Sequence, residues 1–184
     1  MAGTDAQLVR QALQGDQSAY REIVDRHGRS VFNLACRLLR DRAVAEDVTQ
    51  DTFLKAFQRL ASFDLERRLA PWLLRIAHNR AVDVLRGSKP PTTPLDEESL
   101  ASTTVADRPG AELERTELRR VLDQALDRLR PAYKAAIVLR YQEALSYADL
   151  AHVLGVPEGT AKTYVRRGRR ELAELLANAG YGPS

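Results

Sequence analysis

The sequence predicts an all-α fold in which two small helical bundles are joined by a flexible linker, with a helix-turn-helix in the second bundle. Apolar residues recur at helical spacing in both halves, and no segment alternates as a strand does. Ala, Leu and Arg are abundant and aromatic residues make up only 6%, which favours helix over sheet. Residues 88–110 are rich in Pro, Ser and Thr, as linkers are. We therefore expect domains at 1–87 and 111–184.

The composition excludes several classes of protein. The chain has 184 residues and a formal net charge of +3 at pH 7. Its single cysteine, Cys36, rules out an internal disulfide and a cysteine-rich zinc site. No apolar run approaches the roughly 20 residues that cross a bilayer, and the N-terminus lacks the pattern of a signal peptide. We expect a cytoplasmic protein without membrane insertion.

The sequence shows no catalytic or metal-binding motif. Its three histidines, His27, His78 and His152, do not have the spacing of metal ligands, and it contains neither a P-loop nor a nucleophile elbow. We therefore expect no enzymatic activity, no catalytic residue, no metal and no cofactor.

Three principal helices are predicted in the first half. Apolar residues at helical spacing predict one helix across about residues 20–39. Asp41 is the expected N-cap of the next helix, whose apolar face extends to Leu60. Pro71 suits the first turn of a third helix, which runs to about Arg86.

The second half contains the pattern of a helix-turn-helix. Ser146 can cap a short helix, and Gly155 can adopt the left-handed conformation that ends it. A longer helix with polar residues in its first turns follows, and in this motif those turns enter the major groove of DNA. Helices are predicted near 111–129, 131–143, 146–154 and 159–178.

The last predicted helix is cationic on one side and apolar on the other. Like charges four residues apart repel, and Glu174, beside Arg170, is the one acidic partner that we expect for these cations at that spacing. A solvated face is the simpler interpretation, but a polyanion would relieve the repulsion and release counterions. Together the turn and the charge favour DNA binding. The expected contacts with base edges are Lys162, Thr163 and Arg166, and those with phosphates are Arg167, Arg169 and Arg170.

Residues 44–57 carry the opposite charge. Glu46, Asp47, Gln50 and Asp51 fall on one exposed side of the predicted helix, where Asp47 and Asp51 form a like-charge pair. This surface is either a solubilising face or a docking surface for a basic protein partner. An acidic surface is not expected to touch DNA.

A second nucleic-acid surface is predicted on the helix at 71–86. Asn and Arg side chains, which can hydrogen-bond base edges or phosphates, lie along one stripe of it. The preceding loop offers Phe63 for stacking and Arg67 and Arg68 for backbone contacts, whereas Trp72 is expected in the core. The stripe contains Arg75, His78, Asn79, Val82, Asp83 and Arg86.

Four segments follow one another in a set order: AEDVTQDTF, PWLLRIAHNRAVDVLR, the Pro/Ser/Thr-rich linker, and LSYADLAHVLGVPEGTAKTYVRRGRREL. Together they resemble the extracytoplasmic-function (ECF) group of bacterial RNA polymerase sigma factors, over about residues 16–176. The resemblance implies a sigma factor that binds the polymerase core and directs promoter-specific initiation. Such a protein recognises the minus-35 and minus-10 promoter elements and assists DNA melting.

The resemblance also implies roles for the residues singled out above. The acidic face, Glu46, Asp47, Gln50 and Asp51, matches the segment that docks on the clamp helices of the core, with Phe53 as buried support. The second domain matches the minus-35 reader. Members of the group are often held inactive by an anti-sigma factor, so a partner of that kind is expected. The set implied at the minus-10 element is Phe63, Arg67, Arg68, Arg75, Asn79, Asp83 and Arg86, with a flipped-out base held by the loop at 63–70.

Several positions depart from the usual pattern of the group, among them Pro131, which is shifted by one, and Arg166, which stands where some members have an aromatic residue. Tyr164 stands where a cation is common, and Gly168 replaces the usual Ala, at a cost of about 1 kcal/mol in helix propensity. The alternative function is a stand-alone helix-turn-helix regulator. That function would explain the second domain but would leave the acidic face and the stripe at 71–86 without a purpose.

Overall fold

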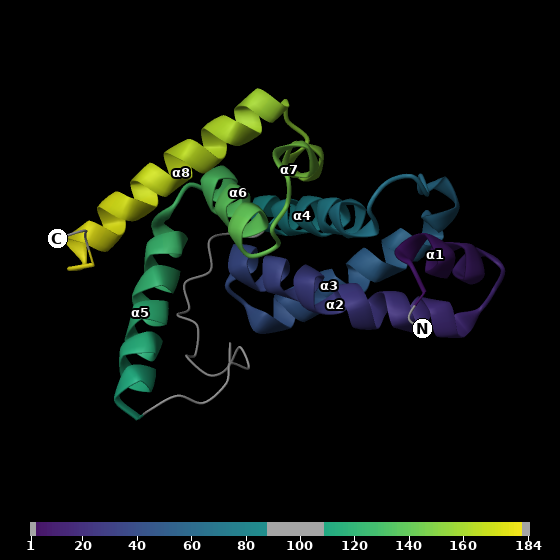
Figure 1. Cartoon of the computed structure of the whole chain (residues 1–184), viewed down its shortest axis with the longest axis horizontal. Coiled ribbons are helices and arrows are strands. Elements are labelled where there is room, and N and C mark those ends of the chain that lie inside the picture. The colour runs from purple at the N-terminus through teal and green to yellow at the C-terminus, as the bar shows by residue number, and fades with distance from the viewer. Residues whose placement is uncertain (1–2, 88–108, 182–184) are drawn as a thin grey trace.

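The computed structural model describes residues 3–87 and 109–181, with side chains in the second range described from residue 116 onward. All regular structure in these ranges is helical, which confirms the predicted fold class (Figure 1). No helix in them is long and apolar enough to cross a membrane. The elements are α1 (Asp5–Leu13), α2 (Gln17–Leu39), α3 (Arg42–Gln58), the 3-10 turn η1 (Leu60–Ser62), α4 (Leu69–Gly87), α5 (Pro109–Arg128), α6 (Pro131–Tyr141), α7 (Tyr147–Leu154) and α8 (Glu158–Asn178).

The first domain is built on the mutual packing of α2, α3 and α4, and α1 packs on α2. Asp41 caps α3 as predicted, because its Oδ1 accepts a hydrogen bond from the amide of Val44 at 3.0 Å. Pro71 lies in the first turn of α4, where a missing amide hydrogen costs nothing. Phe53 is buried beneath the outer face of α3, also as predicted.

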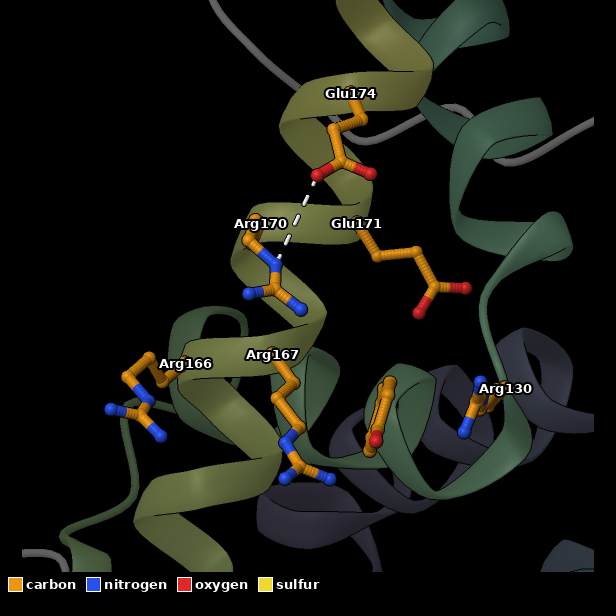
Figure 2. Close-up of a pocket in the computed structure, with 7 residues that line it drawn as sticks. Arg130, Arg166, Arg167, Arg170, Glu171 and Glu174 are labelled. Atoms are coloured by element: carbon orange, nitrogen blue, oxygen red, sulfur yellow. Dashed lines mark ion pairs between the residues drawn. The ribbon is translucent and has the colours of Figure 1, made fainter.

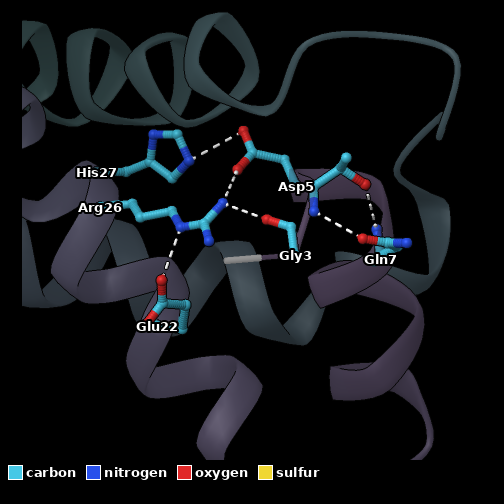
Figure 3. Close-up of polar contacts among 7 residues, drawn as sticks. Gly3, Asp5, Gln7, Glu22, Arg26 and His27 are labelled. Carbon is cyan, nitrogen blue, oxygen red and sulfur yellow. Dashed lines mark hydrogen bonds and ion pairs between the residues drawn. The ribbon is translucent and has the colours of Figure 1, made fainter. Parts of the chain in front are cut away.

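Polar contacts join the start of α1 to the middle of α2 (Figure 3). Arg26 Nε lies 2.8 Å from a carboxylate oxygen of Glu22, and its Nη1 donates to the carbonyl oxygen of Gly3 at 2.7 Å. Asp5 contacts both Arg26, at 3.4 Å, and His27 Nε2, at 3.1 Å. These contacts supplement the apolar packing that holds α1 against the rest of the domain.

The second domain is organised around the pair α6 and α8, against which α5 and α7 pack. The predicted helices are present, and α5 begins at Pro109, slightly earlier than expected. Pro131 opens α6, whose central residues are buried almost without interruption. A helix buried on most of its sides acts as the core element of a small bundle.

The two domains pack against each other, which the sequence did not predict. α7 lies on α4, α6 contacts α2, and the buried apolar residues form one cluster that spans both domains (Figure 1). The predicted linker, 88–110, lies outside the described residues except for Pro109 and Gly110, which begin α5.

Gly168 marks the closest approach of α8 to α6. A Cβ atom built at this position would lie 3.0 Å from Cγ1 of Ile137, 3.2 Å from Cβ of Tyr133 and 3.3 Å from the carbonyl oxygen of Tyr133. Two of these neighbours are backbone or near-backbone atoms, which cannot move aside by a rotamer change. The glycine that appears costly by helix propensity therefore allows the two helices to touch.

We expect Gly168→Ala to lower the free energy of unfolding by about 1 kcal/mol, although Ala is the better helix former. Overpacking costs about 1–3 kcal/mol and outweighs a propensity gain of about 1 kcal/mol. Urea unfolding followed by circular dichroism measures the change. Gly159→Ala, in the same helix with no atom within 4 Å of its added Cβ, is the matched control and should be neutral or stabilising. Equal stabilisation by both substitutions would contradict the packing argument.

Candidate nucleic-acid and polymerase interfaces

The turn between α7 and α8 has the geometry that the sequence predicted. Ser146 Oγ accepts a hydrogen bond from the amide of Asp149 at 3.1 Å and so caps α7. Gly155 ends that helix with φ of 67°, in the left-handed region that glycine adopts without strain. The amide of Val156 then donates to the carbonyl oxygen of Ala151 at 3.1 Å, which closes the turn before α8 begins. The helix-turn-helix prediction is confirmed.

α8 separates its apolar and cationic sides completely over its first half. Ala161, Val165 and Gly168 are buried against the domain. Thr163 is half-buried, and its hydroxyl donates to the carbonyl oxygen of Gly159 at 2.9 Å. The exposed cations are Lys162, Arg166, Arg167, Arg169 and Arg170.

Two exposed ion pairs lie on this cationic side. Lys162 Nζ is 2.7 Å from Glu158 Oε1, which raises the pKa of Lys162, and it also lies 5.7 Å from the ring centroid of Tyr147. Arg170 Nε is 3.9 Å from Glu174 Oε1. The expectation that only Arg170 has an acidic neighbour was therefore wrong. Exposed pairs of this kind contribute little to stability, so both cations remain able to bind another anion.

A pocket of about 600 Å³ lies between α8 and the start of α6 (Figure 2). A hydrogen bond from Arg167 lowers the pKa of the Tyr133 hydroxyl and raises the pKa of Arg167. The guanidinium group of Arg130 lies 5.6 Å from the ring centroid of Tyr133. The sequence did not identify Arg130 and Tyr133 as residues of this site. The only local indication was that a cation, Arg130, directly precedes Pro131. The pocket is lined by Arg130, Tyr133, Arg166, Arg167, Arg170, Glu171 and Glu174.

The outer side of α3 is acidic and includes an exposed apolar residue. Glu46, Asp47 and Gln50 are exposed, and Glu46 pairs with Arg42 of the same helix at 3.1 Å. Leu54 follows Gln50 by about one turn and is 60% exposed. An apolar side chain beside carboxylates is an arrangement suited to binding a protein.

Asp51 differs from the other acidic residues of α3 because it contacts α4. Its Oδ2 lies 2.8 Å from Arg80 Nε, and both side chains are partly shielded from solvent. The sequence placed Asp51 on the free docking face, but in the structure it links two helices of the first domain. Arg80 lies on a different helix from Asp51, so the spacing of residues along one helix could not connect the two.

The predicted stripe on α4 is divided between solvent and the second domain. Asn79, Asp83 and Arg86 are exposed. Arg75 is half-buried and its Nη1 lies 3.2 Å from Nδ1 of His152 on α7. Burial, followed by the charge of Arg75, lowers the pKa of His152. A neutral imidazole can accept the hydrogen bond that Arg75 donates.

The loop before α4 changes one expectation. Phe63 is only 8% exposed, and its ring centroid lies 5.2 Å from that of Trp72. The expectation that Phe63 is free to stack on a base does not hold in this structure, because the ring is part of the core. Arg67 is exposed and pairs with Asp64 at 3.3 Å, whereas Arg68 Nη1 lies 3.1 Å from Asp149 Oδ2 on α7.

The candidate residues thus form three groups rather than one cleft. The cations of α8 face outward from the second domain, the carboxylates of α3 face outward from the first, and α4 lies against α7. Among the side chains of residues 3–87 and 116–181, no group of three or more His, Cys, Asp or Glu residues is arranged to hold a metal ion.

Comparison with known proteins identifies both domains. The family model described as Sigma-70 region 2 matches residues 23–90, and Sigma-70, region 4 matches residues 119–172. The ECF RNA polymerase sigma factor SigW of Bacillus subtilis is 34% identical over 91% of this chain and 94% of its own length. The ECF RNA polymerase sigma-E factor of Haemophilus influenzae is also 34% identical, over 95% of this chain and 94% of its own.

Solved structures agree with these matches. CnrH in complex with the cytosolic domain of CnrY is similar with a TM-score of 0.70 and 28% identity, over 95% of this chain and 97% of CnrH. The sigma factor RpoE of Bartonella quintana, in complex with the anti-sigma factor NepR, gives a TM-score of 0.67 and 25% identity, over 86% of this chain and 96% of RpoE. The chain therefore belongs to the ECF RNA polymerase sigma factors, non-enzymatic proteins that direct promoter-specific transcription initiation by RNA polymerase.

Proposed function

We propose that this sigma factor divides its work among three helices: α8 reads the minus-35 element, α4 engages the minus-10 element, and α3 docks on the clamp helices of the core polymerase. The observation that carries the proposal is the separation of charge. Exposed carboxylates lie on α3 and exposed cations on α8, in different domains. A protein partner and a nucleic acid can then be bound at the same time by different surfaces.

The minus-35 assignment rests on the turn that precedes α8. In a helix-turn-helix the first turns of the second helix enter the major groove, where side chains reach base edges. Lys162, Thr163 and Arg166 occupy those turns. Further along the helix, cations face the flanking phosphates instead. These are Arg167, Arg169 and Arg170.

The minus-10 assignment uses the outer side of α4 and the loop before it. Asn79 and Asp83 are exposed there and can pair with base edges, while Arg86 can contact a phosphate. Arg67 and Arg68 lie within the loop at 63–70, which is proposed to hold an extruded base. Phe63 supports this loop from the core and is not proposed as a stacking residue.

The core-docking assignment centres on Glu46, Asp47 and Gln50, with Leu54 as an apolar anchor beside them. Acidic rims accelerate encounter with a basic partner, and a buried apolar side chain supplies affinity after contact. Asp51 contributes to this surface indirectly, since its pairing with Arg80 orients α3 on α4.

An anti-sigma factor is proposed as a further partner. CnrH and RpoE, both similar to this chain over most of its length, were solved with CnrY and with the anti-sigma factor NepR, respectively. We propose that a protein of this kind binds this chain in the cytoplasm and keeps it from the polymerase.

Transcription with purified core polymerase on a library of genomic fragments tests the proposal as a whole. With this protein added, new start sites should appear, and their upstream sequences should share two motifs at a constant separation. Start sites that are identical with and without the protein would refute the promoter-reading role.

Replacing Lys162 and Arg166 with Ala should reduce initiation at the promoters found in that experiment by about tenfold or more, because each lost base contact costs about 1–3 kcal/mol. Affinity for the core should not change, since neither residue lies on α3. Run-off transcription and a fluorescence binding assay measure the two quantities separately. Unchanged promoter choice would contradict the assignment of α8.

Asp47→Lys should weaken core binding by about tenfold or more, because it places a cation on a face proposed to meet cations. Asp25→Lys makes the same charge change on an exposed position of α2 and is the matched control. Circular dichroism checks that both variants remain folded. Equal loss of core affinity in the two variants would mean that net charge matters and the α3 face does not.

A further inference from the structure

The first two turns of α8 carry an ion pair that faces solvent. Lys162 Nζ lies 2.7 Å from Glu158 Oε1, and each side chain is about half exposed. Glu158 is the first residue of α8, at the end of the helix that enters the major groove in a helix-turn-helix. A Cβ atom built at Gly159 would have no atom within 4 Å, so the space beside the pair is open. The pair is therefore accessible to DNA together with the rest of the cationic side.

A tyrosine ring positions the pair from a second side. The ammonium group of Lys162 lies 5.7 Å from the ring centroid of Tyr147, and the guanidinium group of Arg140 lies 4.8 Å from the same centroid. A hydrogen bond with Glu158 raises the pKa of Lys162, so the ammonium group stays charged. An acceptor and a donor are thus presented side by side, in a fixed order along the helix.

This arrangement matches the major-groove edge of a G·C base pair. N4 of cytosine and O6 of guanine hydrogen-bond to each other, so these two atoms are about 2.9 Å apart. N4 carries a second hydrogen that points into the groove, and N7 of guanine is a further acceptor next to O6. A carboxylate 2.7 Å from an ammonium group can therefore accept from N4 while the ammonium group donates to O6 and N7.

We propose that Glu158 and Lys162 act as one unit that reads a single G·C base pair of the minus-35 element, with Glu158 on cytosine and Lys162 on guanine. This inference rests on the proposed role of α8 and adds Glu158 as a residue that determines specificity. The two side chains keep their mutual contact in the complex, because a carboxylate and an ammonium group each retain hydrogen-bonding capacity for a base.

The same unit discriminates against the other base pairs. In an A·T pair the amino group of adenine lies between two acceptors, N7 of adenine and O4 of thymine, so the carboxylate would lie beside an acceptor on each side. In the reversed G·C pair the carboxylate would meet O6 and the ammonium group would meet the amino group, and both contacts are repulsive. Glu158 would also repel a phosphate. A carboxylate in the first turn thus adds selectivity and lowers affinity for DNA of other sequences.

Glu158→Ala tests the proposal in holoenzyme assembled from core polymerase and the full chain. The template is a promoter recovered by start-site mapping, with each base pair of its upstream motif randomised, and transcripts are counted by sequencing. With the unaltered chain, one position should prefer G·C over the other base pairs by about tenfold. With Glu158→Ala this preference should fall to about twofold or less, because the acceptor for cytosine is missing. The other positions should keep their preferences.

Glu174→Ala is the matched control. It removes a carboxylate from the second ion pair of the same helix, in which Arg170 Nε lies 3.9 Å from Glu174 Oε1 (Figure 2). Glu174 lies about four turns beyond Glu158, outside the turns that enter the groove, so its loss should change no base preference. Circular dichroism checks that the variants remain folded.

Lys162→Ala tests whether the two side chains act together. It should relax the same position as Glu158→Ala, and the double variant should relax that position no further than either single variant, because the unit is already broken. If the two single variants relax different positions, the side chains act separately and the proposal is wrong. Unchanged preferences in Glu158→Ala, or a change that Glu174→Ala shares, would leave only a surface ion pair.

Failure of this inference can be told apart from failure of the proposed function. If the unaltered chain shows no preference at any upstream position, both are refuted. If upstream preferences exist and are lost on replacing Lys162 and Arg166 but are kept in Glu158→Ala, α8 retains its minus-35 role and only the reading by the ion pair is rejected.

Discussion

The close approach of α6 and α8 at Gly168 is the contact on which the DNA-facing part of the molecule depends. With no Cβ at this position, the two backbones come near enough for Tyr133 and Ile137 to pack directly on α8. Ala161 and Val165 continue the buried side towards the start of α8. Because a helix turns by about 100° per residue, burying this stripe forces the cations between these positions outward. The direction of the basic surface thus follows from an apolar contact.

Charge in this chain matters through its placement and not through its total. A net charge of +3 on 184 residues would give only a weak overall field. At physiological salt, charges interact over about 8 Å, so the acidic side of α3 and the basic side of α8 act almost independently. Each can therefore attract its own partner without neutralising the other. Under the proposed assignment of these two surfaces, this independence lets one small protein bridge a polymerase and a promoter.

Local features of the structure were predictable from the sequence, and features that depend on distant pairs were not. Asp41 and Gly155 were identified correctly because caps and left-handed glycines are determined within a few residues. The pairing of Asp51 with Arg80 and the burial of Phe63 against Trp72 depend on how helices and loops fold back on one another. Helical periodicity shows which side of a helix is apolar, but it does not show which element covers that side.

The packing of α7 on α4 could not be predicted from the sequence for the same reason. Residues on the two helices are separated by the linker and by α5 and α6, so no spacing in the sequence connects them. Arg75 was predicted on a nucleic-acid-binding stripe, and nothing in the sequence connected it with His152. A candidate binding residue on a helical stripe can therefore contact another helix of the same chain. Only the tertiary structure shows whether such a residue is free to bind a partner.

The ionic contacts between the domains are of a kind that can be broken without leaving a buried charge unpaired. When Arg40 leaves Asp127, that carboxylate keeps Lys134, which is only 5% exposed and whose pKa is lowered by burial. When Arg68 leaves Asp149, the carboxylate keeps the hydroxyl of Ser146 at 2.9 Å. Arg68 is itself well exposed, so its pair contributes at most about 1 kcal/mol before screening by salt. The ionic contacts therefore add little to the stability of the contact between the domains, which rests mainly on the apolar cluster that spans both of them.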